Sequence, residues 1–367
     1  MYAFDNVPVA SSYKIEGTLT DRPLNGVSTL DLVLIQRHVL ALEQFDTATE
    51  TIAGDVNSDG RVSGLDLVEL RRLILGQLEN FPNNDSWRFV DPNQDFDSPT
   101  SPWPFLEEIV ILNLLDDVAN QDLLGIKIGD VNGNAEANSL FAGNRNYSEA
   151  HLKLSDQYLE KGQTVTVPVS LADLKEVAAI QFTLELNGAR INGVERLGLD
   201  VTNDNIAIHS DEVMTLAWFD EEGVQLEGAM FALDITATKD GSLSEMLSIT
   251  DAVTASEVYD IDLEPSTLDL NFEKAYIAIN SSFELMQNEP NPFTTNTKIG
   301  FSIPTGTEAT ISVIDISGRV VYSKEDYYNA GYHEVVLSQE NIQSRGVLYY
   351  QLKTSSQTAI KKMILID

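Results

Sequence analysis

The chain of 367 residues holds 57 Asp and Glu against 23 Lys and Arg, which gives a formal net charge of −34. Such an acidic surface argues against a nucleic-acid partner, because phosphate backbones are bound by clusters of Lys and Arg, and it suits cation binding instead. With no cysteine, disulfides and thiolate metal sites are excluded, and the length predicts two or three domains with cores of their own.

Two broad classes of protein lose support. No stretch approaches the roughly 18 apolar residues of a membrane-spanning helix, so we expect no transmembrane segment. The sequence has no P-loop, no Gly-x-Ser-x-Gly elbow and no Gly-x-Gly-x-x-Gly motif after a strand, and its four histidines lack metal-pair spacing. We therefore predict that this chain is not itself an enzyme.

The first 16 residues have β character. Tyr2-x-Phe4-x-x-Val7 and then Tyr13-Lys14-Ile15 read as the last two strands of a β-sandwich, and they resemble the carboxypeptidase-regulatory or Cna-B type. They lack the basic and apolar regions of a secretory signal. We expect residues 1–16 to be the end of a truncated sandwich and the chain to be the C-terminal part of a longer surface protein, although a truncated gene prediction would look the same.

Residues 55–66 have the pattern of a calcium loop. Calcium takes about six to eight oxygen ligands, and here oxygen-bearing side chains stand at positions 1, 3, 5 and 12, with a Gly at position 6 for the sharp turn. The predicted ligands are the side chains of Asp55, Asn57, Asp59 and Asp66, the backbone oxygen of Arg61, and Ser63 through a water. The alternative is a solvated acidic turn.

An internal repeat supports the calcium loop. A shift of 35 residues superposes residues 27–40 on residues 62–75, so the loop and its helix are duplicated. Duplicated loop–helix units with Asp at position 12 resemble the dockerin family, which implies a small helical Ca²⁺-binding domain over residues 17–138. The first copy departs from the family pattern at its ligand positions, so its own loop should not bind calcium; the residues there are Thr20, Arg22 and Leu24.

A second candidate site follows later in the chain, where residues 129–134 repeat the start of the calcium loop. Its candidate ligands are Asp130, Asn132 and Asn134. Position 12 is Phe141, so a metal there would need a carboxylate from elsewhere, either Asp31 or Asp122. The alternative is a capping turn that kept the sequence and lost the metal.

After an Asn/Gly/Ser-rich linker at 132–148, residues 150–275 alternate as about nine strands of a jelly-roll-like sandwich. Lys161–Val169 and Val177–Leu184 resemble the opening strands of cohesin domains and of related cellulose-binding modules. That resemblance implies a partner bound by a sheet face, which is a dockerin-type protein or a glycan. We expect Trp218 to pack in the core, and a plain spacer is the alternative.

Residues 283–367 read as a third, all-β domain of Ig-like type. They resemble the type A C-terminal sorting domain of the type IX secretion system of Bacteroidetes in four ordered motifs. The motif residues are Asn288, Pro290, Asn291, Pro292, Phe293, Gly318, Gly346, Lys361 and Lys362. The resemblance implies the secretion machinery as a partner, transport across the outer membrane and an extracellular or cell-surface location. An ordinary terminal Ig-like domain is the alternative.

The predicted fold class is therefore multidomain: a small α dockerin-like calcium domain followed by two all-β sandwiches, one cohesin-like and one Ig-like. The predicted function is adhesion or assembly by a secreted, modular surface protein. The alternative is the targeting portion of an enzyme of polysaccharide catabolism whose catalytic domain lies outside these residues.

Overall fold

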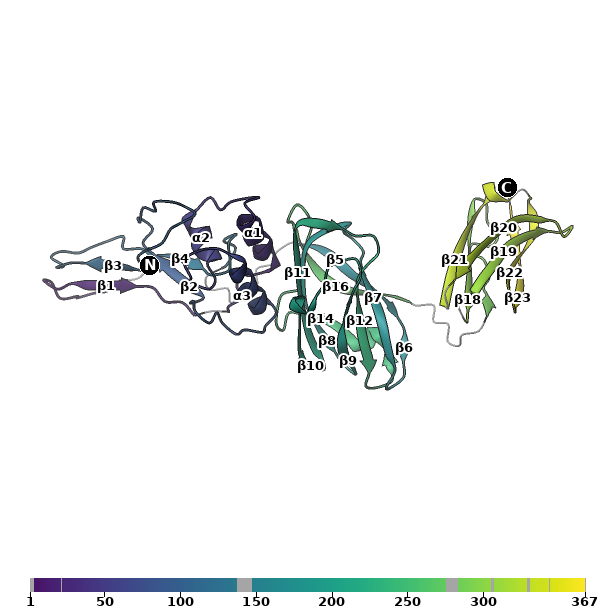
Figure 1. Cartoon of the computed structure of the whole chain (residues 1–367), viewed down its shortest axis with the longest axis horizontal. Coiled ribbons are helices and arrows are strands. Elements are labelled where there is room, and N and C mark those ends of the chain that lie inside the picture. The colour runs from purple at the N-terminus through teal and green to yellow at the C-terminus, as the bar shows by residue number, and fades with distance from the viewer. Residues whose placement is uncertain are drawn as a thin grey trace. The chain divides into compact units, whose positions relative to one another are not determined.

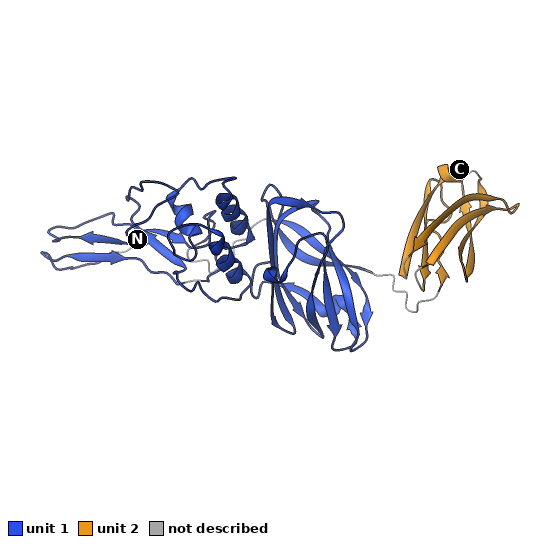
Figure 2. Ribbon diagram, in the orientation of Figure 1, with its two compact units in different colours: residues 1–273 blue, residues 274–367 orange. Residues whose placement is uncertain are grey.

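The computed structural model describes residues 3–20, 22–136, 147–274, 283–304, 307–328, 331–342 and 344–366. The chain divides into two compact units, Met1–Glu273 and Lys274–Asp367 (Figure 2). Within the described ranges no helix has the length and apolar character needed to span a membrane. Most of the predicted linker at 132–148 lies outside the described residues.

Three helices form the dockerin-like region: α1 (Thr29–Val39), α2 (Ala48–Gly54) and α3 (Gly64–Ile74). The two repeat copies begin alike, because Ser28 and Ser63 each form a capping box with the Asp three residues later. The buried faces of α1 and α3 share one core, to which they contribute Leu32, Ile35, Leu67, Leu70, Leu73 and Ile74.

Two short antiparallel ladders belong to the same region (Figure 1). β2 (Trp87–Val90) pairs with β4 (Leu124–Lys127), and β1 (Tyr13–Glu16) pairs with β3 (Glu108–Ile111). β1 is the one strand in the described part of residues 1–16. The expected pair of sandwich strands is therefore replaced by a single strand whose partner comes from the segment after α3.

The middle of the chain is a β-sandwich built from one ten-stranded sheet that folds over its own core (Figure 1). The strands of this sheet are β5 (Ser148–Asp156), β7 (Thr164–Leu171), β8 (Glu176–Leu186), β9 (Ala189–Arg196), β10 (Ile206–Ser210), β11 (Val213–Gln225), β12 (Ala229–Ala237), β14 (Leu247–Thr250), β15 (Glu257–Tyr259) and β16 (Pro265–Lys274). Smaller elements are β6 (Tyr158–Leu159), β13 (Gly241–Ser242), α4 (Leu243–Met246) and a 3₁₀ turn (Asn203–Asn205).

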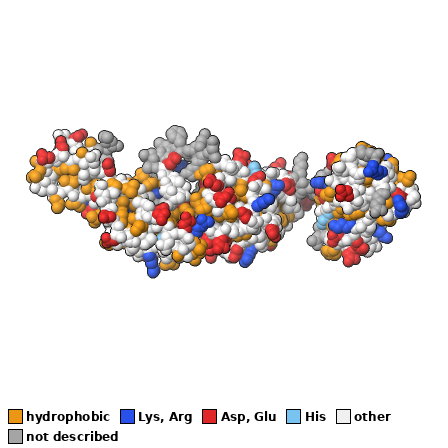
Figure 3. Space-filling view, turned by 90° about the horizontal axis from the view of Figure 1, so that it is seen from above, with side chains coloured by type: hydrophobic (Ala, Val, Ile, Leu, Met, Phe, Trp, Pro, Cys, Tyr) orange, Lys and Arg blue, Asp and Glu red, His pale blue; other side chains and the backbone are white. Residues whose placement is uncertain are grey.

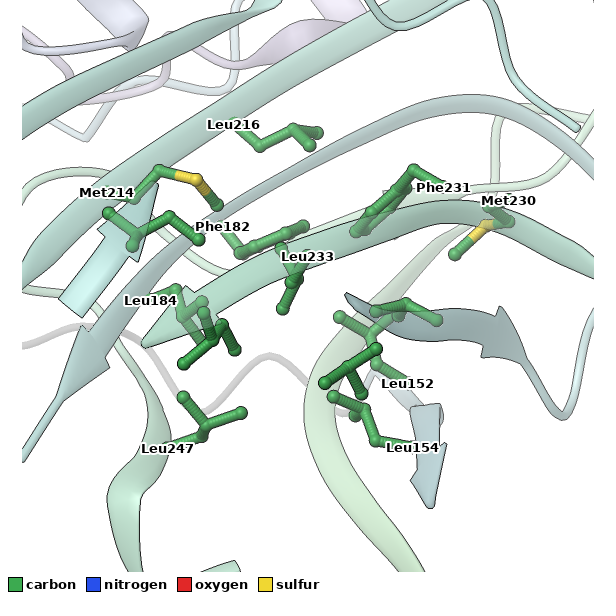
Figure 4. Close-up of a cluster of buried hydrophobic side chains, with 14 of the residues drawn as sticks. Leu152, Leu154, Phe182, Leu184, Met214, Leu216, Met230, Phe231, Leu233 and Leu247 are labelled. Atoms are coloured by element: carbon green, nitrogen blue, oxygen red, sulfur yellow. The ribbon is translucent and has the colours of Figure 1, made fainter. Parts of the chain in front are cut away.

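The sandwich core lies between the strands β8 and β11 and the strand β12 that faces them. Phe182 and Leu216 point toward Phe231 and Leu233 (Figure 4). Trp218 is also buried in this core, as expected from its alternating strand.

The second unit holds two antiparallel sheets around a separate core. One consists of β17 (Glu284–Leu285), β18 (Asn296–Ile303) and β21 (Gly331–Ser338); the other of β20 (Val320–Tyr328), β19 (Thr307–Asp315), β22 (Gly346–Thr354) and β23 (Thr358–Leu365). A 3₁₀ turn at Gln339–Asn341 follows β21. Alternate residues of β21, β22 and β23 are buried in this core, so the two sheets form the predicted small sandwich.

Candidate calcium loops and the docking interface

The loop after α2 is wound around the side chain of Asp55. One carboxylate oxygen of Asp55, Oδ1, accepts a hydrogen bond from the Asp59 N–H at 3.0 Å, and Oδ2 accepts one from the Gly60 N–H at 3.0 Å. Asn57 Oδ1 also accepts from the Asp59 N–H, at 2.9 Å. Gly60 has φ +85°, the left-handed conformation that favours glycine. The predicted ligands at positions 1, 3 and 5 therefore stand on one tight turn.

Asp66 joins this turn to α3. It is fully buried in the first turn of the helix. Its Oδ1 accepts from the Asn57 N–H at 3.0 Å, and its Oδ2 accepts from the Ser63 N–H at 2.8 Å. The Ser63 hydroxyl takes part in the helix cap, because it accepts from the Leu65 N–H at 3.3 Å. The structure thus brings positions 1, 3, 5 and 12 of the loop together.

The electrostatics of the loop fit a hard cation. Burial raises the pKa of Asp55 and of Asp66, backbone hydrogen bonds offset part of this, and the neighbouring carboxylate charges raise both further. In the described part of the chain, no three Asp, Glu or His side chains gather closely enough to hold a metal alone. Calcium here would therefore also need the Asn57 side chain and backbone oxygens, as the loop pattern provides.

The second candidate loop repeats this geometry. Asp130 Oδ1 accepts from the Asn134 N–H at 3.1 Å, and Oδ2 accepts from the Ala135 N–H at 2.8 Å. Asn132 Oδ1 accepts from the same Asn134 N–H at 3.1 Å. These three bonds match, position by position, the three that shape the Asp55 loop.

Asp31 of α1 takes the part that Asp66 plays in the first loop. It is fully buried, its Oδ1 accepts from the Val131 N–H at 2.9 Å, and its Oδ2 accepts from the Ser28 N–H at 2.9 Å. Burial raises the pKa of Asp31 well above its usual value, and the charge of Asp130 adds to the shift. The other candidate, Asp122, is exposed in the segment before β4.

The two ends of the dockerin-like region meet beside this second loop. Asn25 Nδ2 donates to the Glu136 backbone oxygen at 2.9 Å, and the Glu136 N–H donates to Asn25 Oδ1 at 3.3 Å. A Cβ at Gly26 would lie 2.7 Å from Ala135. The segment before α1, which carries Arg22 and Leu24, is therefore a turn against the second loop.

α1 packs on the outer face of the sandwich within the same chain (Figure 1). Val33, fully buried, forms a small core with Ala179 of β8 and Tyr259 of β15, and Leu30 packs against it. The Thr29 N–H donates to Gln181 Oε1 at 2.6 Å, and Arg37 Nε donates to the Glu221 backbone oxygen at 3.0 Å.

The C-terminal end of α3 completes this docking interface. Thr215 Oγ1 of β11 donates to the Leu75 backbone oxygen at 2.7 Å. The Arg71 guanidinium lies 5.0 Å from the centre of the Phe219 ring. The N-terminal half of α3 faces elsewhere, since Leu65 and Val68, the repeat counterparts of Leu30 and Val33, are 58% and 51% exposed.

Tyr259 links the interface to the capping residue of α1. Its hydroxyl donates to Glu257 Oε2 at 2.6 Å and lies 3.1 Å from Ser28 Oγ. Burial is the main reason that the pKa of Tyr259 is raised above its usual value, so the phenol stays protonated. Ser28 is also 3.4 Å from the Asp31 carboxylate, which places the docking interface next to the second loop.

Sequence patterns did not identify these interface residues. One signal was present: Val177–Leu184 is apolar at nearly every position, and β8 is buried on both faces along this run. A strand that is apolar on both faces must be packed against other elements on both faces. A sandwich strand with one solvent-exposed face instead alternates apolar and polar residues. Gln181 and Thr183 are the polar residues in this run, and both are buried at the docked face or next to it.

In the second unit, the predicted sorting motif is built into the core and the strand edges. Asn288 is 2% exposed; its Nδ2 donates to the Pro290 backbone oxygen at 3.1 Å and to Thr297 Oγ1 at 2.9 Å. Phe293 is buried, and Asn291 Oδ1 accepts from the Ile364 N–H at 2.9 Å. The remaining motif residues occupy turns or strands: Pro292 follows a cis bond, Gly318 and Gly346 have positive φ, and Lys361 and Lys362 lie in β23.

Two family models match parts of the chain. Residues 25–75 and 53–95 match the dockerin type I domain, and residues 290–366 match the secretion system C-terminal sorting domain. The chain therefore contains a dockerin type I domain and a secretion-system sorting domain, and both predicted resemblances are confirmed. The sorting domain implies secretion to the cell surface or to the outside.

Solved structures similar to this chain include cohesins. The sixth cohesin of scaffoldin B from Acetivibrio cellulolyticus, in complex with a Cel5 dockerin, is 17% identical, with 34% of this chain and 100% of that chain covered and a TM-score of 0.27. A type I cohesin–dockerin complex from Clostridium thermocellum is 15% identical, with 34% of this chain and 100% of that chain covered and a TM-score of 0.27.

A non-cellulosomal cohesin from the archaeon Archaeoglobus fulgidus is 16% identical, with 34% of this chain and 90% of that chain covered and a TM-score of 0.23. No curated protein matches the sequence. The helical dockerin region and the two β-sandwiches that follow it confirm the predicted order of one small α domain and two all-β domains.

Proposed function

We propose that this chain is a self-docked assembly module of a secreted surface protein, in which calcium braces a dockerin domain against its own sandwich. One observation carries the proposal: α1 is seated on β8, β11 and β15 through Val33, Thr29 and Arg37. The dockerin domain and the sandwich, docked on each other, would act as one rigid body for adhesion or assembly. Its sorting domain would recruit the type IX secretion machinery for passage across the outer membrane.

Calcium is assigned to two places in this proposal. The first is the Asp55 loop with Asp66. The second is a split site that joins Asp130, Asn132 and Asn134 to Asp31 of α1. When bound, calcium supplies two positive charges that offset clustered carboxylates. At extracellular millimolar calcium, a site with a Kd of about 10⁻⁴ to 10⁻³ M is at least half occupied.

The experiment is a pair of substitutions at equivalent positions of the repeat. Val33→Asp places a charge inside the docking interface, whereas Val68→Asp places the same charge at a position that is 51% exposed. We expect Val33→Asp, in full-length protein with calcium, to increase amide exchange along β8 and β15 and to raise the radius of gyration in X-ray scattering. Val68→Asp should change neither, and equal behaviour of the two variants would refute the docked arrangement.

A second candidate function is glycan binding, as the targeting part of a polysaccharide-degrading system. It is favoured by a cavity of about 330 Å³ between α2, β4 and the second loop, whose wall includes Trp87, Thr47, Thr49 and Asn132. Aromatic and hydroxyl groups together suit a sugar ring. Quenching of tryptophan fluorescence by soluble oligosaccharides, abolished by Trp87→Ala, would support this candidate, and catalysis would then belong to another domain or protein.

A further inference from the structure

The Asp55 loop is held by a side chain from outside the loop–helix unit. Asn84 lies in the segment between α3 and β2. Its Nδ2 donates to the backbone oxygen of Asp55 at 2.9 Å and to that of Val56 at 3.3 Å. One amide therefore fixes two consecutive peptide groups at the point where the loop leaves α2.

Arg88 of β2 holds Asn84 in place. Its Nη1 donates to Asn84 Oδ1 at 3.0 Å and lies 3.4 Å from Ser58 Oγ, inside the loop. The other edge of the guanidinium pairs with Glu107, with Nη2 to Oε2 at 2.6 Å. The guanidinium also lies 5.2 Å from the centre of the Phe105 ring. These contacts leave the Asn84 amide with a single orientation, with its oxygen toward Arg88 and its nitrogen toward the loop.

We propose that Asn84 is a positioning residue for calcium at the Asp55 loop, buttressed by Arg88 and Glu107. This inference rests on the proposed calcium role of the loop. Without metal, the clustered carboxylates repel one another and weaken the closed loop. A backbone that is already fixed at Asp55 and Val56 loses less conformational freedom when calcium binds, so the affinity rises. Within the loop, the Asn84 side chain contacts backbone oxygens only, and it is not itself a ligand.

The coupling must also run in the opposite direction, because binding free energies are reciprocal. If Asn84 strengthens calcium binding, calcium must strengthen the contacts of Asn84 and Arg88. The segment from Asn84 to Glu107, which belongs to neither repeat copy, then becomes part of the calcium-dependent structure. Protection of its amides should rise when calcium is added.

The test uses full-length protein and two neighbouring asparagines. Asn84→Ala removes the clamp, and Asn83→Ala changes an exposed side chain next to it. Calcium titrations followed by amide exchange in residues 55–66 report this loop alone, while residues 130–135 serve as an internal reference. We expect Asn84→Ala to weaken calcium binding at residues 55–66 by about 10-fold. Residues 130–135 should be unaffected, and Asn83→Ala should bind calcium with wild-type affinity.

The outcomes separate two hypotheses. If residues 55–66 bind calcium in the wild type, and the affinity is equal in Asn84→Ala and Asn83→Ala, the positioning role of Asn84 is refuted. The calcium role of the loop then still stands. Absence of calcium binding by the wild-type loop overturns both. If Asn84→Ala does not fold, Asn84→Gln keeps the polar volume and displaces the amide by one methylene, and it should show the same selective loss.

Discussion

At the scale of single residues, Asp59 is the proposed ligand that can be removed with the least damage to the metal-free fold. Asp55 accepts two backbone N–H groups, so its loss would also open the loop in chelator. The carboxylate of Asp59 receives only long contacts, from Arg61 at 3.4 Å and Asn57 at 3.5 Å. The structure therefore separates two ligands that the sequence pattern treats alike.

We predict that Asp59→Ala lowers the melting temperature in millimolar calcium and hardly changes it in chelator. A site with free calcium at ten times its Kd stabilises the fold by about 1.4 kcal/mol, which is the most that the substitution can remove. Differential scanning calorimetry of wild type and variant, with and without chelator, measures the difference. Asp122→Ala, at an exposed carboxylate, is the control, and an equal loss in both buffers would contradict the metal assignment.

His38 provides a pH-dependent contact near the end of α1. Its Nδ1 accepts a hydrogen bond from the Phe45 N–H at 2.9 Å, and its ring stacks on Phe45 with 4.1 Å between centroids. Burial lowers the pKa of His38 below its usual value, against the opposing charge of Glu50. Protonation of Nδ1 would remove the acceptor for Phe45.

The sign of the pH effect follows from this lowered pKa. The unfolded chain takes up the proton first as pH falls, so the contribution of His38 is complete above the unfolded pKa of about 6.5 and is lost as pH falls through the folded value. We expect the unfolding free energy, measured by urea titration between pH 8 and pH 5, to fall less steeply in His38→Gln than in wild type. Parallel pH profiles would show that His38 has no such role.

At the scale of elements, the split site distinguishes a metal site from a plain capping turn. Asp130→Asn keeps the size of the side chain and removes one of two facing buried carboxylates. In chelator the variant should lose little stability, because the relief of repulsion with Asp31 offsets the hydrogen bond from Asn134 or Ala135 that an amide nitrogen cannot accept. In calcium it should lose more, because a ligand charge is also missing. Thermal unfolding in the two buffers should show this difference, whereas a turn without metal would lose the same stability in both.

Much of this region follows from local sequence. The ligand spacing, the capping boxes at Ser28 and Ser63 and the repeat itself are short-range patterns, and the structure reproduces them. Short-range sequence patterns could not show that Asp31, rather than Asp122, completes the second loop. That outcome depends on the pairing of β2 with β4, which returns the chain to α1 about 100 residues later. Asn84 carried no signal, because a single polar residue in a loop has no period or spacing to read.

At the scale of the whole molecule, acidic side chains are scattered over the visible surface (Figure 3). Few charged groups take part in the docking interface: its contacts are apolar or use neutral hydrogen bonds, apart from those of Arg37, Arg71 and Glu257. The interface should therefore tolerate high salt better than contacts between charged surfaces. The docking of modules within one chain was not predictable from composition, which describes each module separately.

The two units should unfold independently, because each has its own core. Asn288→Ala removes a buried amide that bonds Pro290 and Thr297, at a cost of about 1–3 kcal/mol. Calorimetry should show a lower transition for the second unit and an unchanged one for the first, and secretion from a type IX host should fall. Asn296→Ala, at an exposed position, is the matched control; loss of secretion in that variant as well would show that the buried amide is not the cause.

Hydrogen bonds between Asn25 and Glu136 hold the two ends of the dockerin segment together, which bears on the transfer of this segment from one protein to another. A segment that leaves a host chain and returns to it at the same point can be inserted into a surface loop without separating the residues on either side. The dockerin segment between these residues has this arrangement apart from the pairing of β3 with β1, and the second candidate calcium loop lies where its two ends meet. Transplanted as one piece into an exposed loop of an unrelated carrier, it should bring calcium-dependent stability with it.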